Sequence, residues 1–272
     1  MRKKYIPWIL RSLLLYMSAF SQGTLDKTGG RSFFGRVVDI TEVPFIALVI
    51  PGSRATCTGF IVAQKWVITA AHCFEETQKD AIVVIGTNDR VKWSNIIEAE
   101  SVFVHPDYLV KHEESDIALI KLKHKIKISK KSKIINIASK GWPENVLRRR
   151  CYTAGYGRHM TTGSSGLLHG GQVSVGIGPY PYDCSGLAKK ADHLIWSNRN
   201  ESEPICFGDY GSPLICDSEA VGIGVVSFPC GKSKYGVGCG ESYVDGYVSV
   251  QNNFNWLKSH ISCLPTSCNK GY

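Results

Sequence analysis

The sequence predicts an all-β fold of antiparallel strands, arranged as a sandwich or a barrel. Short apolar runs recur along the chain between turns that contain Gly, Pro, Asn or Ser, and there is no internal repeat or low-complexity tract. The chain has 272 residues, 43% of them hydrophobic, which is enough to bury the core of one large β unit or two small domains. Its ten cysteines are typical of an oxidising compartment.

Six apolar runs are expected to form strands. They are FIALVI at 45–50, WVITA at 66–70, AIVVIG at 81–86, DIALIKL at 116–122, QVSVGIG at 172–178 and VGIGVVSF at 221–228. One helix is expected at 252–261, because an Asn can cap its start and Phe254, Leu257 and Ile261 share one face. The boundary between two halves is expected near 140–150.

Residues 1–21 predict a signal peptide. The segment begins with three basic residues, continues in an apolar run over 6–20, and places Ala19 and Ser21 at the two positions that signal peptidase reads. A signal anchor is the alternative, although the run is short for a membrane span and is interrupted by Arg11. A secreted, extracellular protein is therefore expected.

The rest of the chain adds no sign of membrane or nucleic-acid binding. Residues 22–36 are polar and Gly-rich, and are expected to form a leader or propeptide. No other segment approaches the length of a transmembrane helix. The formal charge is +9, and removal of the four basic residues in the signal lowers it to about +5. That mild excess predicts neither a membrane nor a nucleic-acid partner.

Six motifs resemble those of trypsin-like serine proteases, in the same chain order. They are WVITAAHC at 66–73, DIALIKL at 116–122, CYTAGYG at 151–157, CFGDYGSPLIC at 206–216, VVSF at 225–228 and GYVSVQNNFNWL at 246–257. The resemblance covers about residues 37–262. It implies two antiparallel six-stranded β-barrels over about 37–145 and 146–251, a C-terminal helix at 252–261 and a tail at 263–272.

The resemblance also implies disulfide bonds. The expected pairs are Cys57–Cys73, Cys151–Cys216 and Cys206–Cys239, with Cys230 as the second choice of partner for Cys206. Four further cysteines then remain, and they allow three connectivities that the sequence does not resolve: Cys184, Cys230, Cys263 and Cys268.

The same resemblance identifies a catalytic triad that has lost its nucleophile. In the family a serine oxygen attacks, a histidine takes its proton, and an aspartate holds the histidine's tautomer. His72 and Asp116 occupy the last two positions, but Tyr210 stands where the serine belongs. The Tyr hydroxyl lies a whole ring further from the backbone and its pKa is about 10. Ser212 is the alternative nucleophile, although a shift of two residues removes it from the oxyanion-hole geometry.

The loop around Tyr210 keeps other family residues as relics. Gly208 matches a donor of the oxyanion hole, and Asp209 matches the aspartate that pairs with a newly cut N-terminus. Cleavage after Arg36 would free Val37 for that pairing, although the two glycines that usually follow are absent. Without cleavage the protein is expected to stay zymogen-like.

The expected specificity pocket has also changed. Pro204 and Ile205 lie where trypsins carry an acid for Lys or Arg substrates. Asp245 is expected to project into the pocket from the last strand. The segment that pairs with substrate backbone is Ser227, Phe228 and Pro229, and Pro229 has no N–H to donate. The alternative is that this loop aligns differently.

A lysine-rich segment at 121–133 predicts a basic surface. On a strand, Lys121, Lys123, Lys125 and Lys127 would share one face, and Lys130, Lys131 and Lys133 would extend the charge. An acidic partner such as a heparin-like glycan is one interpretation, and a solvated strand edge is the other. Asn200 begins a glycosylation sequon. The histidines are scattered, so neither a metal site nor a cofactor is expected.

Together these features predict a secreted protease homologue that is not an enzyme and acts by binding. The degenerate centre resembles the inactivated protease paralogues of the scabies mite, among the group 3 mite allergen-like proteins. That resemblance implies interference with host defence, host plasma or complement proteins as partners, and a monomer. The alternatives are a residual peptidase that uses Ser212 and an endogenous, non-catalytic regulator of a protease cascade.

Overall fold

The computed structural model describes residues 35–52, 56–74, 80–108, 114–157, 166–177, 193–198, 205–206, 208–229, 243–262 and 264. Several predicted features lie outside these residues: the signal peptide, the leader up to residue 34, Asn200, Pro204, nearly all of the tail, and Cys184, Cys230, Cys239, Cys263 and Cys268. No helix in the described part of the chain is long and apolar enough to cross a membrane.

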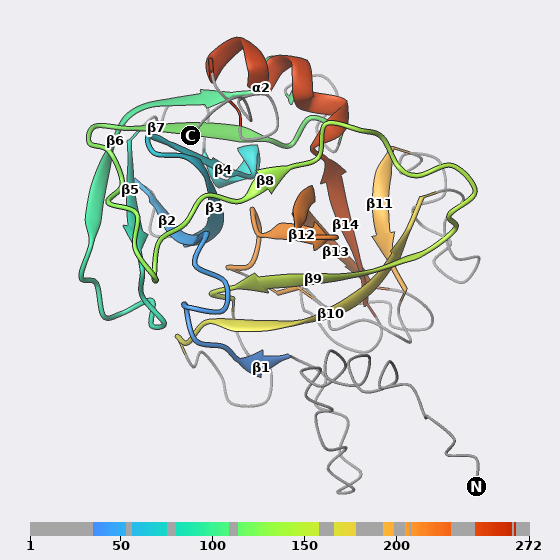
Figure 1. Ribbon diagram of the computed structural model, residues 1–272, viewed down its shortest axis with the longest axis horizontal. Helices are drawn as coiled ribbons and strands as arrows, with labels where there is room; N and C mark the ends of the chain where they lie inside the picture. Colours follow the sequence, from blue (N-terminus) through green and yellow to red (C-terminus); the bar gives the residue numbers. More distant parts are fainter. Residues whose placement is uncertain are drawn as a thin grey trace, which may run out of the picture. The chain divides into compact units, whose positions relative to one another are not determined.

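The first half of the chain forms a closed antiparallel barrel (Figure 1). Its six strands are β2 (Ile46–Pro51), β3 (Cys57–Ala63), β4 (Trp66–Thr69), β5 (Ala81–Ile85), β6 (Ile96–Val104) and β7 (Ala118–Leu122). They pair in the order β2-β3-β4-β7-β6-β5. Strands this rich in Val, Ile and Leu bury their apolar side chains inside the barrel, and Phe60, Ile68 and Leu119 are fully buried there.

The second half forms another closed ring of six antiparallel strands. They are β9 (Arg149–Gly155), β10 (His169–Gly176), β11 (Leu194–Ser197), β12 (Pro213–Cys216), β13 (Glu219–Pro229) and β14 (Tyr243–Ser249). The pairing runs β10-β11-β14-β13-β12-β9, and β9 closes the ring against β10. The predicted fold of two six-stranded antiparallel barrels is therefore confirmed.

Two short strands cross the expected boundary between the halves. β1 (Arg36–Val37) pairs with β10, and β8 (Asn136–Ile137) pairs in parallel with β13. Val37, expected in the first barrel, therefore adds to the sheet of the second barrel, as does β8. The order of strands along the chain does not predict these two pairings, because they depend on long-range register rather than on local pattern.

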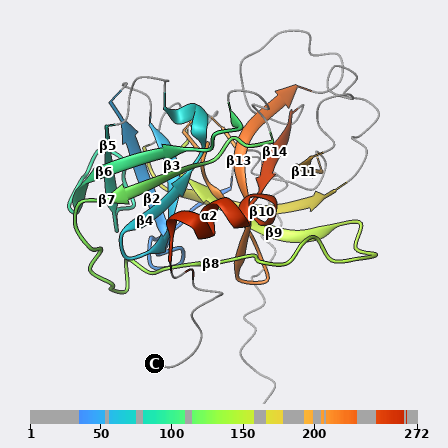
Figure 2. The same ribbon diagram turned by 90° about the horizontal axis from the view of Figure 1, so that it is seen from above.

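The C-terminal helix is shorter than predicted and begins differently. A 3₁₀ turn, η2 (Gln251–Asn253), leads into α2 (Phe254–His260). No side-chain cap forms at its start, because the amide of Asn253 instead donates to the carbonyl of Ser249 at 3.0 Å. Although α2 follows the second barrel in the chain, it packs beside the first (Figures 1 and 2): the His260 ring lies 4.9 Å from that of Phe103 in β6.

Candidate functional site

His72 and Asp116 are brought together by the pairing of β4 with β7. His72 lies in the 3₁₀ turn η1 (Ala71–Cys73) just after β4, and Asp116 lies just before β7. One carboxylate oxygen of the buried Asp116 accepts from the backbone N–H of His72 at 2.9 Å, and the other lies 2.6 Å from His72 Nδ1. This second contact fixes the orientation of the imidazole.

The aromatic ring beside His72 is that of Tyr210. The two ring centroids are 5.0 Å apart and the planes meet at 78°, an edge-to-face arrangement. Burial raises the pKa of the Tyr210 phenol to about 12, and the negative charges of Asp245 and Asp209 raise it further in the same direction. The phenol is therefore neutral at physiological pH.

Thr58 of the first barrel holds the loop that carries Tyr210. Its N–H donates to the Tyr210 carbonyl at 2.9 Å, and its hydroxyl donates to the Gly208 carbonyl at 2.8 Å. The same hydroxyl accepts from the N–H of Tyr156 at 3.1 Å. Gly211 has φ +87°, and a Cβ there would collide with the Thr58 carbonyl, so the loop needs glycine at this position.

Asp209 is buried and bound by backbone groups. Its carboxylate accepts from the N–H of Gly157 at 2.8 Å and of Cys206 at 2.9 Å. Burial raises its pKa to about 6, against the lowering effect of these two hydrogen bonds. Val37, its expected partner after cleavage, lies in β1 opposite His169. In the uncut chain Val37 is half exposed, whereas Asp209 is buried, so the two are not paired. Arg36, the residue before the expected cleavage point, forms an ion pair with Glu42.

The hydroxyl of Ser212 has its hydrogen-bond partner in the second barrel. Ser212 is fully buried, and its Oγ lies 3.2 Å from the hydroxyl of Thr153 in β9. Its N–H donates to the Asp209 carbonyl and its carbonyl accepts from Gly224, both within 2.9 Å. These three contacts and its burial hold Ser212 in place.

Three residues expected in the specificity pocket do meet. Asp245 lies opposite Ser227 in the β13–β14 register, and its Oδ2 accepts from the N–H of Ile205 at 3.0 Å. Burial raises the pKa of Asp245 to about 7. The nearby Ser227 hydroxyl acts in the opposite direction and lowers that pKa.

Three buried polar atoms around Asp245 have no hydrogen-bond partner among the described residues. They are Asp245 Oδ1, Ser227 Oγ and the hydroxyl of Tyr247. Phe228 turns toward Trp196, with ring centroids 6.1 Å apart. Pro229 ends β13 opposite Tyr243, so it does occupy a strand position. The N–H of Asp245 donates to the hydroxyl of Ser197 in β11 at 2.8 Å. Thr58, Ser197 and Tyr247 were missed by sequence reasoning, since only strand register brings them to the site.

Disulfide bonds flank the site. Cys57 is bonded to Cys73 beside His72, and Cys151 is bonded to Cys216 after the Tyr210 loop. Cys206 is also disulfide-bonded, to a cysteine outside the described residues, so its pairing with Cys239 stays a prediction. Among the described residues no group of three or more His, Cys, Asp or Glu could hold a metal ion.

The lysine-rich segment does not form the predicted stripe. β7 ends at Leu122, so of the seven lysines only Lys121 lies in a strand. Lys121 lies 2.6 Å from Glu100 and Lys123 lies 2.5 Å from Glu98, both acids in β6. The other five follow an exposed loop: Lys125, Lys127, Lys130, Lys131 and Lys133. The basic surface is therefore a loop rather than one face of a strand.

Comparison with known proteins agrees with this architecture. The family model Trypsin matches residues 33–257. Mouse kallikrein-8 is 27% identical over 93% of this chain and 94% of its own length. Rat tissue-type plasminogen activator is 28% identical over 84% of this chain, and mouse complement factor I is 27% identical over 93%. The chain spans less than half the length of these two, 44% and 42% respectively.

A solved structure shares the fold. The mouse brain serine protease neuropsin superposes with a TM-score of 0.65 over 83% of this chain and 98% of its own, at 24% identity. The family match begins before Val37 and thus includes Arg36 and all of β1. Because the family model covers most of the sequence, this chain belongs to the trypsin family.

Proposed function

We propose that this chain is a secreted trypsin-family protein that does not cleave peptides and acts by binding other proteins. One observation carries the proposal: the ring packed against His72 is that of Tyr210. The motif resemblance assigns this loop position to the family's nucleophilic serine. The disulfide bonds at the described cysteines support an extracellular location.

The chemistry of Tyr210 argues against its acting as a nucleophile. With a pKa of about 12, the phenol supplies almost no phenolate at neutral pH. Its ring also fills space beside His72 that the substrate carbonyl would need. Loss of the serine in a protease with this chemistry lowers turnover by about 10⁶-fold, or about 8–9 kcal/mol of barrier.

A residual peptidase that uses Ser212 is the competing hypothesis. The contact of Ser212 Oγ with Thr153 and its complete burial oppose it, because attack would require this loop to unfold from β9 and β13. A fluorophosphonate probe separates the two hypotheses. The secreted protein should stay unlabelled by mass spectrometry under conditions that label trypsin fully. Labelling that maps to Ser212, and that disappears in Ser212→Ala, would overturn the proposal.

We infer from the resemblance to inactivated mite paralogues that the partners are host plasma proteins, those of complement above all. The similarity to complement factor I is compatible with this but extends over only 42% of that protein. The test is capture from host plasma compared with capture from the animal's own tissue extract, followed by a complement lysis assay. Selective capture of a complement protein together with reduced lysis supports the inference. Selective capture of the animal's own protease would favour an endogenous regulator.

A further inference from the structure

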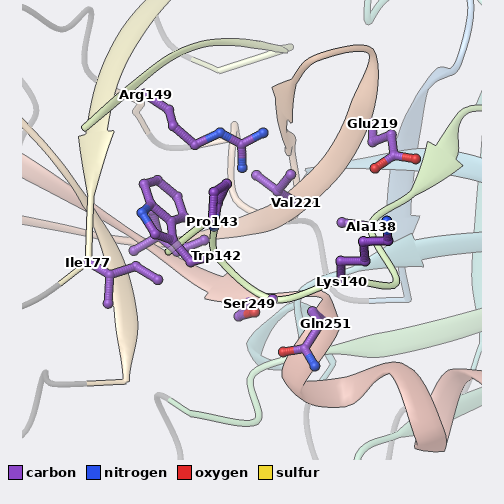
Figure 3. Close-up of a pocket in the computed structure, with 12 residues that line it drawn as sticks. Ala138, Lys140, Trp142, Pro143, Arg149, Ile177, Glu219, Val221, Ser249 and Gln251 are labelled. Atoms are coloured by element: carbon purple, nitrogen blue, oxygen red, sulfur yellow. The ribbon is translucent and has the colours of Figure 1, made fainter. Parts of the chain in front are cut away.

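A second concave site lies on the second barrel, apart from His72 and Tyr210 (Figure 3). It is a pocket of about 170 Å³, built where the connection between β8 and β9 passes over the ends of several strands. Trp142, Ile177, Ile195 and Val221 form its apolar lining. None of its lining residues belongs to the candidate site described above.

The Trp142 wall of this pocket is held in place before any ligand binds. The indole N–H donates to the Val146 carbonyl at 2.5 Å. The guanidinium of Arg149 lies 5.2 Å from the ring centroid, and its Nη2 is 2.6 Å from the carboxylate of Asp217. Figure 3 shows Trp142 between Arg149 and Ile177 in this view. A prearranged aromatic wall lowers the entropy cost of binding.

The size of the pocket restricts what it can accept. Small-molecule and cofactor sites usually measure about 300–1,000 Å³, whereas a cavity of about 150 Å³ accommodates a single benzene ring. The space of about 170 Å³ therefore fits one large side chain. Part of the apolar lining is open to solvent, since Ile177 is 45% exposed. Leu147 does not line the pocket, but its carbonyl lies against Gly176, the neighbour of Ile177, and Leu147 is 83% exposed. Such exposed apolar groups beside a pocket favour a protein partner.

One cation of the lining, Lys140, provides a place for a carboxylate next to that side chain. Two cations, Lys140 and Arg149, and one carboxylate, Glu219, line the pocket. Arg149 is paired with Asp217, whereas Lys140 is exposed and forms no ion pair with the described residues. An exposed cation at the rim of an apolar pocket complements a carboxylate on the partner.

We propose that this pocket binds one large apolar side chain of a partner protein, with a neighbouring carboxylate held by Lys140. The carboxylate belongs to an acidic residue next to the apolar residue in the partner's chain. The proposal goes beyond the loss of peptide cleavage and does not depend on it.

The test is fluorescence polarisation with the full secreted protein and short labelled peptides. Four internal peptides differ only at two central positions: Glu-Phe, Gln-Phe, Lys-Phe and Glu-Ala. A fifth peptide ends in Phe with a free carboxylate. We expect the Glu-Phe peptide to bind most tightly. Tighter binding of the Phe-terminated peptide would overturn the acidic neighbour and favour the end of a partner chain instead. Equal binding of all five, or binding of none, would overturn the proposal.

Variants locate the binding. Trp142→Ala should weaken the preferred peptide by at least about tenfold, as truncation of a central aromatic residue usually does. Lys140→Glu changes an exposed residue and should shift the protein's preference from the Glu-Phe peptide toward the Lys-Phe peptide. Glu219→Gln removes a carboxylate from the lining and should strengthen binding of the acidic peptides. Trp93→Ala is the matched control, since Trp93 also donates its indole N–H to a loop carbonyl, that of Arg90, but does not line the pocket. Unchanged peptide preference in Lys140→Glu would overturn the proposal even if Trp142→Ala fails to fold.

Discussion

The imidazole of His72 lies edge-to-face against the phenol ring of Tyr210, with centroids 5.0 Å apart, while its Nδ1 remains 2.6 Å from Asp116. The same histidine thus keeps the partner that orients it and has an aromatic neighbour on another side. An edge-to-face pair contributes about 0.5–1.5 kcal/mol beyond the area it buries. His72 therefore has a structural role here whether or not it takes part in chemistry.

Replacing Tyr210 by serine should not restore strong cleavage after Lys or Arg. Asp245, the acid found in the pocket, is buried, has a pKa of about 7 and accepts from the Ile205 N–H, so it is poorly prepared to receive a substrate cation. Chromogenic Lys, Arg and Phe substrates would measure kcat/KM for Tyr210→Ser beside trypsin. Fluorophosphonate labelling of the variant would report whether the introduced serine is activated at all. Trypsin-like rates on the Lys and Arg substrates would contradict the prediction.

Removing the Asp116 carboxylate should destabilise the protein. In Asp116→Ala the buried N–H of His72 and its Nδ1 both lose their acceptor, which should cost about 2–3 kcal/mol. For a domain of this size that corresponds to a fall in Tm of several degrees. Differential scanning calorimetry gives the value. Asp116→Asn, which keeps one acceptor oxygen, should lose less, and an equal loss in both variants would show that the hydrogen bonds are not the cause.

The free energy of unfolding should carry a contribution from Asp245 and Asp209 that falls as pH rises from about 4 to 7. Burial raises the pKa of Asp245 to about 7 and of Asp209 to about 6, so the folded state holds protons that the unfolded state has already lost. Asp245→Asn should therefore gain stability over the wild type near pH 8, and the gain should shrink toward pH 4. Urea unfolding at several pH values measures this, with the exposed Asp80→Asn as control. A gain that instead grows toward pH 4 would reverse the assigned sign.

Thr58→Val should loosen the Tyr210 loop. The substitution keeps the shape of a buried side chain but removes a hydroxyl that donates to Gly208 and accepts from Tyr156. An unsatisfied buried group of this kind costs about 1–3 kcal/mol. Denaturant unfolding gives that cost, and hydrogen exchange of the Tyr156 amide should accelerate. In the exposed control Thr41→Val both quantities should change little.

Heparin retention should depend on the unpaired lysines of the 121–133 segment. Lys121 and Lys123 are paired with Glu100 and Glu98. The other five are exposed and form no ion pairs with the described residues: Lys125, Lys127, Lys130, Lys131 and Lys133. Substituting these five unpaired lysines by Ala should lower the salt concentration needed for elution. The Lys121→Ala, Lys123→Ala double variant should change it less. If both variants lower the elution salt concentration equally, the unpaired lysines of the loop have no special role in heparin binding.

The apolar pattern alone predicted an all-β sandwich or barrel, because the period of a strand is local information. The two barrels and the meeting of His72 with Asp116 were predicted through the resemblance of six motifs to those of trypsin-like proteases. The exchange of β1 and β8 onto the second sheet, the ion pairs of Lys121 and Lys123, and the uncapped start of α2 could not be read in this way. They depend on residues about twenty to well over a hundred positions apart in the chain, or on how the chain enters the helix.

The sequence by itself determined that Tyr210 follows Asp209 in a loop of the trypsin-family type, because residue identity and spacing need no coordinates. Only the tertiary structure decided where the neighbouring hydroxyls point: Ser212 inward to Thr153, and Thr58 across to Gly208 from the other barrel. It also decided that Asp245, Ser227 and Tyr247 share one buried site, and that Trp142 and Arg149 form the wall of a pocket. The physical reason is that closing a barrel sets the register of strands far apart in the chain, and register decides which side chains face each other.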